Sequence, residues 1–292
     1  GAPPDGLHVR RAGAPIGLRT GEVMGGLRSI VGSGLYNIVF IGWTAVSVTI
    51  MLLLLPFPRP VMQRAVKIWA WSQHWALKFL VGLDFEIRGR ENIVHGVAIY
   101  ASKHQSAWDT YVFYLLFSDP SYVLKKELVK IPVWGWIARK CAAIAVDRDG
   151  GASALKALVR DTRQRLADDR PVIIFPEGTR TQPGTHRPYH PGIAALYSQC
   201  DAPVIPVALN SGLFWGRRSY AKQSGTIIIE FLPPLPTDMK RRDFMQRLET
   251  QIESTAERLA LEGADRYPLT RPALVQNRDT NEASPSTGPA VD

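Results

Sequence analysis

The chain has 292 residues, of which 46% are hydrophobic and 21% charged, so it can bury the core of one large domain or two small ones. Its formal net charge of +9 indicates an anionic partner: nucleic acid, an acidic bilayer surface or a phosphate-bearing substrate. Cys141 and Cys200 are the only cysteines, and they show no CxxC or Cys/His spacing. This pattern argues against a cysteine zinc site and a disulfide framework, and two buried thiols are the simpler interpretation.

The N-terminal region divides into a polar segment and an apolar one. Residues 1–26 are rich in Gly, Pro and Arg and lack apolar periodicity, so we expect a disordered segment. No charged residue occurs between Arg28 and Arg59, and the core of this stretch, Leu35–Leu55, ends at Pro56. Because about 20 apolar residues can cross a bilayer, the stretch predicts a membrane anchor, with a buried core helix as the alternative.

A second helix is expected over Val61–Val81, where basic residues fall near one stripe and tryptophans spread over the rest of the surface. That combination is typical of a helix in the lipid headgroup zone. Residues 27–82 are therefore predicted to form a hydrophobic two-helix membrane motif. The pattern does not decide whether the pair spans the bilayer or is embedded in it.

From Asp84 onward, short apolar runs alternate with helical stretches. Expected strands are Phe85–Ile87, Val97–Ala101, Tyr122–Leu124, Ala142–Val146, Val172–Phe175, Val204–Leu209 and Thr226–Phe231. Expected helices are Ser106–Phe117, Ala152–Ala167, Gly192–Ser198 and Met239–Leu261. The alternation predicts an α/β domain over residues 83–262, with a mixed, mostly parallel sheet covered by helices. Residues 263–292 are polar and contain proline, and we expect a disordered tail.

The first chemistry-bearing segment is Ser102-Lys103-His104-Gln105-Ser106-Ala107-Trp108-Asp109. His104 and Asp109 lie about 140° apart on one continuous helix, but they can meet if His104 precedes the helix and Asp109 starts it. Such a pair makes a general base, because the carboxylate fixes the imidazole tautomer. Ser106-x-x-Asp109 is equally a capping-box pattern, and on spacing alone that more common role is favoured.

Two further segments follow expected strands and offer groups for an anion. Phe175-Pro176-Glu177-Gly178-Thr179-Arg180 combines a glycine, which lets a ligand approach the backbone, with an arginine fork suited to phosphate. The run from Lys125 and Lys126 to Trp136, followed by Val146-Asp147-Arg148, supplies more basic side chains. Taken singly, each segment is explained as well by a solvated surface turn.

Together and in this order, the segments resemble the glycerolipid acyltransferase family, most closely its 1-acyl-sn-glycerol-3-phosphate (lysophosphatidate) acyltransferases. His104-x4-Asp109 is similar to the catalytic HX4D block of the family, and Phe175–Arg180 to its FPEGTR block. The Lys125–Trp136 run with Arg148 resembles the second block, and Val204–Leu209 the fourth. The family commonly has Asn where this chain has Lys103, and Lys before the glycine where it has Tyr189-His190-Pro191-Gly192.

The resemblance implies a membrane enzyme that moves a fatty acyl group from acyl-CoA or acyl-carrier protein to the sn-2 hydroxyl of 1-acyl-glycerol-3-phosphate. It implies that His104 is the base oriented by Asp109, that no acyl-enzyme forms, and that neither metal nor cofactor is needed. The substrate would be held by Lys125, Lys126, Arg148, Glu177, Gly178, Thr179 and Arg180. The location would be the inner membrane, with the active site on the cytoplasmic side.

Two rival functions remain open at this point. The acceptor can be another lysolipid, such as a lyso-ornithine lipid, or the chain can be a non-catalytic membrane lipid-binding protein. A nucleic-acid binder would account for the net charge but not for the uncharged segment over residues 29–58 or the Glu177–Arg180 cluster.

Overall fold

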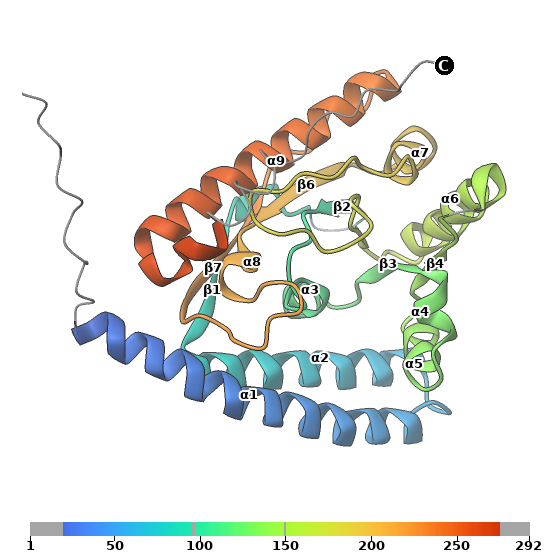
Figure 1. Cartoon of the computed structure of the whole chain (residues 1–292). Helices are drawn as coiled ribbons and strands as arrows, with labels where there is room; N and C mark the ends of the chain where they lie inside the picture. Colours follow the sequence, from blue (N-terminus) through green and yellow to red (C-terminus); the bar gives the residue numbers. More distant parts are fainter. Residues whose placement is uncertain (1–19, 95–96, 149, 275–292) are drawn as a thin grey trace, which may run out of the picture.

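The computed structural model describes residues 20–94, 97–148 and 150–274, with side chains from Ser29 onward (Figure 1). It opens with helix α1 (Thr20–Leu53), helix α2 (Arg59–Ala76) and a π-helical turn η1 (Leu77–Val81). Pro56 and Pro58 separate the two long helices, because proline cannot continue a helix, whereas Pro60 is tolerated in the first turn of α2.

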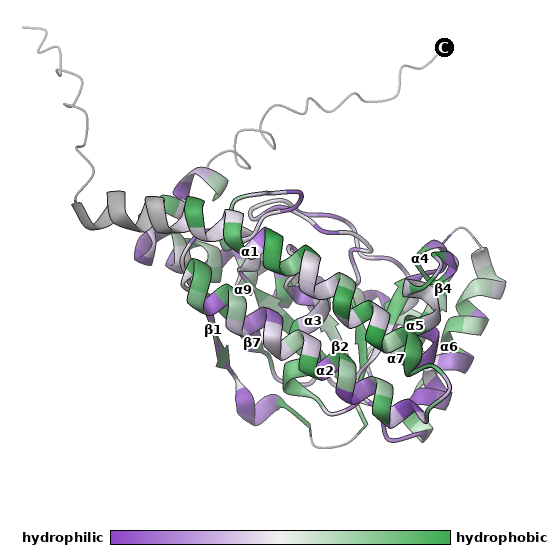
Figure 2. Ribbon diagram, turned by 90° about the horizontal axis from the view of Figure 1, so that it is seen from below, coloured by the Kyte–Doolittle hydropathy of each residue, from purple (hydrophilic) through white to green (hydrophobic). Residues whose placement is uncertain are grey.

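The first two helices lie side by side beneath the sheet (Figures 1 and 2) and revise the expectations for this region. Helix α1 begins at Thr20, so residues 20–26 are helical rather than disordered, and residues 1–19 lie outside the described residues. Among the described helices, only α1, over Ser29–Leu53, is long and apolar enough to cross a membrane. Helix α2 buries Gln63, Gln73 and His74, so the predicted hydrophobic two-helix motif narrows to one apolar helix and one mixed helix.

Seven strands form one sheet in the order β1-β7-β6-β2-β5-β3-β4. The strands are β1 (Leu83–Arg88), β2 (Ile99–Ser102), β3 (Ser121–Lys125), β4 (Ile144–Val146), β5 (Val172–Ile174), β6 (Val204–Leu209) and β7 (Gly225–Phe231). Strands β6, β2, β5, β3 and β4 run parallel, whereas β7 is antiparallel to β6 and carries β1 parallel to itself. The predicted mixed, mostly parallel sheet is confirmed.

The central strand β2 shows how the two faces of the sheet are covered. Tyr100 belongs to the core that includes residues of α1, α2 and α3 (Asp109–Leu116). Ile99 and Ala101 point to the opposite face and pack with α6, α7 and the first half of α9. The remaining helices are α4 (Lys126–Lys130), α5 (Trp134–Lys140), α6 (Gly151–Ala167), α7 (Gly192–Gln199), α8 (Ser211–Phe214), α9 (Arg241–Arg266), η2 (Arg90–Asn92) and η3 (Pro268–Thr270).

The predicted disordered tail is wrong over its first part. Helix α9 continues to Arg266, and η3 follows it. Tyr267 packs edge-on against Phe214, and Leu274 is buried in the core, so apolar contacts hold residues 263–274 against the domain. Residues 275–292 lie outside the described residues.

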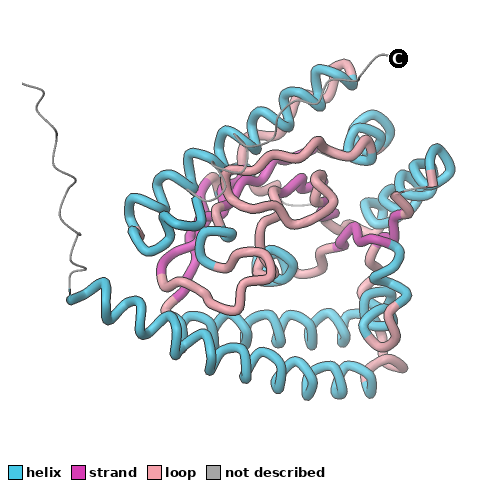
Figure 3. Tube along the Cα trace, viewed as in Figure 1, coloured by secondary structure: helices cyan, strands magenta, loops and turns pink. Residues whose placement is uncertain are grey.

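All five parallel strands deliver their following loops to one edge of the sheet, where ligands bind in open α/β folds. The loop after β2 carries His104, the loop after β4 carries Arg148, and Ser211 follows β6. The loop after β5, residues 175–191, contains neither helix nor strand and crosses the centre of this edge (Figure 3). These loops, together with the start of α3 and the end of β3, position the groups of the candidate site.

Candidate active site

His104 and Asp109 meet at the central edge of the sheet. His104 Nδ1 lies 3.0 Å from Asp109 Oδ2. They converge because His104 sits in the loop after β2, whereas Asp109 is the first residue of α3. The Asp109 side chain is fully buried, and the His104 side chain is 12% exposed. A buried carboxylate on one ring nitrogen leaves Nε2 as the atom able to accept a proton from a substrate.

Asp109 is held by donors on both carboxylate oxygens. Oδ2 accepts hydrogen bonds from the backbone amides of Gln105 (2.6 Å) and Ser106 (2.8 Å). Oδ1 accepts a hydrogen bond from Ser211 Oγ at 2.6 Å. The carboxylate thus organises the turn that enters α3 and contacts His104 at the same time, so the capping-box pattern and the His104–Asp109 contact are compatible. Ser211 comes from a distant segment that no local spacing could reveal.

The imidazole of His104 also has a fixed plane. It stacks on the ring of Phe175, with centroids 4.1 Å apart and an interplanar angle of 22°. The backbone carbonyl of His104 accepts a hydrogen bond from the Thr181 amide at 2.8 Å. Both contacts come from the loop after β5, so that loop sets the direction in which Nε2 points.

An apolar cavity of about 450 Å³ runs from the N-terminal helices to the His104 ring. Its wall is built from side chains of α1, α2, α3, α5, α6, β3 and the loops at the sheet edge. Representative lining residues are Val48, Met51, Val66, Tyr114, Ile137 and Leu158. Such a wall accepts a hydrocarbon chain, because each buried methylene contributes about 0.8 kcal/mol.

A second cavity, of about 310 Å³, adjoins the first and is basic. Its basic lining residues are Lys125, Arg148, Arg187 and Arg217, and Glu177 is the one acidic residue in the wall. Arginine forks and lysine ammonium groups match phosphate oxygens. The two cavities share Lys125, Arg148, Gly178 and His190, so an apolar chain and an anionic headgroup can be bound next to each other.

Gly178 occupies the shared wall and has to be glycine. Its φ is +70°, a left-handed conformation that costs other residues energy. A Cβ there would lie 2.6 Å from the His190 ring and 3.1 Å from the Arg148 guanidinium carbon. Burial and the Arg148 charge lower the pKa of His190, which favours a neutral ring at neutral pH.

The predicted substrate-binding residues differ in where they lie. Glu177 lines the basic cavity, but its side chain is fully buried, and its carboxylate pairs with Lys103 and accepts the His104 amide hydrogen bond. Lys126 forms an ion pair with Asp147 and lines neither cavity. Arg180 also lines neither cavity.

The other predicted residues, Lys125, Arg148, Gly178 and Thr179, line the basic cavity. Arg187 and Arg217 were missed, because each lies in a polar loop segment with no motif around it. In the part of the chain that the structure describes, no three His, Cys, Asp or Glu side chains are grouped to hold a metal ion.

Several known proteins are similar to this chain in sequence. The sequence model of the Acyltransferase family matches residues 84–210. A 1-acyl-sn-glycerol-3-phosphate acyltransferase of Pseudomonas aeruginosa is 34% identical over 206 residues, which cover 69% of this chain and 80% of the relative. Another from Limnanthes alba is 30% identical over 191 residues, covering 65% of this chain and 67% of the relative.

A solved structure shares the fold. The crystal structure of the 1-acyl-sn-glycerophosphate (LPA) acyltransferase PlsC from Thermotoga maritima superposes with a TM-score of 0.59 and 17% sequence identity. The match covers 82% of this chain and 97% of that one. At this identity, the likeness shows that the two chains share one architecture.

Proposed function

Because this chain belongs to the acyltransferase family that includes the 1-acyl-sn-glycerol-3-phosphate acyltransferases, we propose that it transfers a fatty acyl group to the sn-2 hydroxyl of 1-acyl-glycerol-3-phosphate, giving phosphatidic acid. The donor is the thioester of acyl-CoA or acyl-carrier protein. One observation carries the proposal: His104, paired with Asp109, lines an apolar cavity that adjoins a basic one.

The apolar cavity is suited to an acyl chain, and the basic cavity to the phosphate of the acceptor. Lys125, Arg148, Arg187 and Arg217 supply positive charge for a phosphate group, which carries up to two negative charges. Charge-assisted hydrogen bonds to such groups are roughly twice as strong as neutral ones. A phosphate bound there places a nearby glycerol hydroxyl within reach of His104.

His104 then acts as the general base. Nε2 takes the proton of the acceptor hydroxyl while the hydroxyl oxygen attacks the thioester carbonyl carbon. The C–S bond breaks, and the departing thiolate receives the proton from Nε2, which restores the neutral imidazole. Asp109 accepts the Nδ1 hydrogen bond and stabilises the imidazolium between the two proton transfers. The transfer is direct, without a covalent enzyme intermediate.

Proton transfer alone accelerates a reaction by about 10²–10⁴-fold, so positioning the two lipids supplies much of the remainder. Both substrates carry chains that leave a bilayer only at high cost, since each methylene is worth about 0.8 kcal/mol. The exposed apolar side chains of α1, α2 and η1 support membrane docking beside the apolar cavity. They include Ile38, Ile41, Leu53, Ile68, Trp75 and Phe79.

The packing of α1 favours an embedded helix rather than a crossing one. Gly32, in the first half of the helix, approaches the Leu80 carbonyl so closely that a Cβ would lie 2.1 Å from the oxygen. Met51, near the end of the helix, packs in a cluster with Ile137 of α5. Because α1 contacts the domain at both of these positions, it lies along the protein and can insert into one leaflet, with the site on the cytoplasmic side where the thioester donors are.

An acceptor panel tests the proposed function. The full chain, in vesicles that contain anionic lipid, is given radiolabelled acyl-CoA or acyl-carrier protein with lysophosphatidate, lysophosphatidylcholine, a lyso-ornithine lipid or no acceptor. We expect labelled phosphatidic acid with lysophosphatidate and little product with the others. Preferential acylation of another lysolipid would make that lipid the substrate, and vesicle binding without transfer to any acceptor would contradict an enzymatic role.

A further inference from the structure

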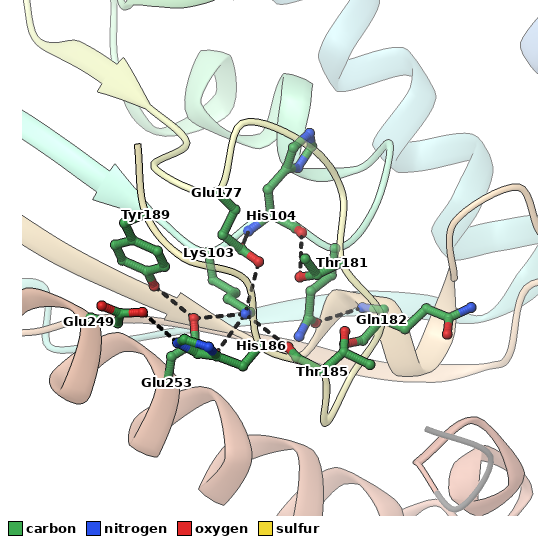
Figure 4. A network of polar contacts seen from close by, with 12 residues as sticks. Lys103, His104, Glu177, Thr181, Gln182, Thr185, His186, Tyr189, Glu249 and Glu253 are labelled. Atoms are coloured by element: carbon green, nitrogen blue, oxygen red, sulfur yellow. Dashed lines mark hydrogen bonds and ion pairs between the residues drawn. The ribbon is translucent and has the colours of Figure 1, made fainter. Parts of the chain in front are cut away.

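A buried ionic cluster lies directly behind His104 (Figure 4). Lys103 Nζ lies 3.1 Å from Glu177 Oε2 and 2.7 Å from Glu253 Oε2. The Lys103 side chain is 2% exposed, that of Glu177 is fully buried, and that of Glu253 is 20% exposed. One ammonium group thus bridges two carboxylates from segments far apart in the chain: the loop after β5 and helix α9.

The cluster is connected to the catalytic histidine through its backbone. Glu177 Oε1, the oxygen not facing Lys103, accepts the His104 amide hydrogen bond at 3.0 Å. The His104 carbonyl is bonded to the amide of Thr181 from the same loop. Glu177 therefore links the lysine to the residue that carries the imidazole, while the imidazole itself points away toward the apolar cavity (Figure 4).

Helix α9 anchors the loop that contains Glu177. Tyr189 Oη donates a hydrogen bond to Glu253 Oε1 at 2.8 Å, so Glu253 holds the far part of the loop as well as Lys103. Residues 175–191 have no strand or helix of their own, and long irregular loops are held in place by such side-chain contacts. The cluster joins this loop and the His104 segment to one rigid helix.

Burying the charges of Lys103, Glu177 and Glu253 costs free energy, so they are an inefficient means of stabilising the fold. Taking ions out of water is expensive, and well-packed apolar side chains often replace buried ion pairs without loss of stability. Burial raises the pKa of Glu177, and the Lys103 ammonium is the largest influence in the opposite direction. An oriented, charged carboxylate on the His104 amide is what this arrangement provides beyond packing.

We propose that Lys103 and Glu253 are positioning residues for the acyl transfer: they orient Glu177, which holds the His104 backbone so that the ring meets both Asp109 and the substrate hydroxyl. Neither the Lys103 side chain nor the Glu253 side chain lines the apolar or the basic cavity. The inference rests on the proposed function, since it assigns a role within that reaction. It predicts a change in turnover without a change in substrate affinity.

The test compares kcat and KM for lysophosphatidate in wild type, Lys103→Met and Glu253→Gln. Lys103→Met keeps an unbranched side chain, one heavy atom shorter, but removes the charge, and Glu253→Gln is isosteric. We expect kcat to fall by about tenfold or more in Lys103→Met and by a smaller factor in Glu253→Gln, with KM within about twofold, because small misplacements of a catalytic group are costly in rate. Wild-type transfer is measured first, so an inactive wild type would refute the proposed function rather than this inference.

Glu249→Gln is the matched control. Glu249 lies one helical turn before Glu253 on α9 and pairs with the half-exposed His186 at 2.6 Å. Like Glu253→Gln, the Glu249→Gln substitution removes one carboxylate charge from α9, but at a residue that does not contact Lys103. The kcat of Glu249→Gln should therefore stay within about twofold of wild type.

Stability is separated from positioning by a double variant, Lys103→Met with Glu253→Gln. It removes one cation and one anion and should melt at a higher temperature than Lys103→Met alone, while its kcat stays low. If Lys103→Met does not fold, the double variant and Glu253→Gln decide the question. Wild-type kcat in folded variants that lack Lys103 or the Glu253 charge would overturn the proposal, as would a raised KM at unchanged kcat.

Discussion

The apolar cavity that His104 lines and the basic cavity that adjoins it are built in opposite ways. The apolar cavity is lined by many side chains from regular elements, among them α1, α2, α5 and β3. The basic cavity depends on a few charged side chains, mostly from loops at the sheet edge. Binding in the first is therefore spread over many small contacts, whereas binding in the second is concentrated in a few strong ones.

This contrast teaches where each kind of specificity resides. A change in the apolar wall alters which chain fits, because cavity volume is shared among many residues. A change in the basic wall alters whether the headgroup binds at all. A change in the His104–Asp109 pair, or in the residues that position it, should lower turnover while leaving the affinity for both substrates intact.

The largest effect on kcat should come from changing the His104–Asp109 pair, through Asp109→Asn. The amide would present a donor where Asp109 accepts hydrogen bonds from the Gln105 and Ser106 amides and from His104. We expect kcat to fall by about 10²–10⁴-fold, with both KM values nearly unchanged, because the base loses its orienting partner. Steady-state kinetics on the folded variant measure this. A fall of less than about threefold would place catalysis elsewhere.

Next in size is the basic cavity, probed by Arg148→Ala. Losing one charge-assisted contact of about 1.5–3 kcal/mol should raise KM for lysophosphatidate by about 10- to 100-fold and change the acyl-donor KM little. Arg160→Ala removes an arginine of α6 that is 75% exposed and lines neither cavity, and it serves as the control. An equal rise in both KM values would contradict the division between the cavities.

A smaller effect is expected in the apolar cavity from Val48→Phe. The larger ring fills part of the volume near α1, so long acyl donors should lose kcat/KM relative to short ones, by about fourfold for each methylene that no longer fits. Val46→Phe makes the same change on a half-exposed position of α1 that does not line the cavity. Parallel chain-length profiles for the two variants would show that Val48 does not limit the chain.

The smallest effect concerns the dryness of the apolar cavity. Burial raises the pKa of the Cys141 thiol to about 12, and Cys141 lines this cavity. Iodoacetamide should alkylate it slowly at pH 8, and the rate should rise about tenfold per pH unit up to that pKa, since only the thiolate reacts. In the Cys200→Ser variant Cys141 is the one remaining cysteine, so all alkylation of cysteine occurs there. Rapid labelling at pH 8 would reveal a wet, open cavity.

Local patterns sufficed to predict the seven strands, because each is a short apolar run that follows a turn or a helix. The His104–Asp109 contact was accessible for the same reason, since its partners are five residues apart. The short helices α4, α5 and α8 were missed, because none is long enough to show a helical period.

Contacts between distant segments could not be read from the sequence. Ser211 reaches Asp109 and Glu253 reaches Lys103 only because the parallel strands and α9 bring these segments to one edge. The contacts of Glu177 were hidden for the same reason: its motif identifies the loop, but only the fold shows that the carboxylate bonds to Lys103 and to the His104 amide. Arg187 and Arg217 joined the site with no local pattern at all.

The most direct measurement is single-turnover acyl transfer to lysophosphatidate by wild type and His104→Ala in the same vesicles, with vesicle binding recorded for both. His186→Ala, at a half-exposed histidine outside both cavities, is the control. We expect His104→Ala to bind vesicles normally and to transfer at least about 10²-fold more slowly, as the loss of a general base requires. Transfer at the wild-type rate by that variant would contradict the account.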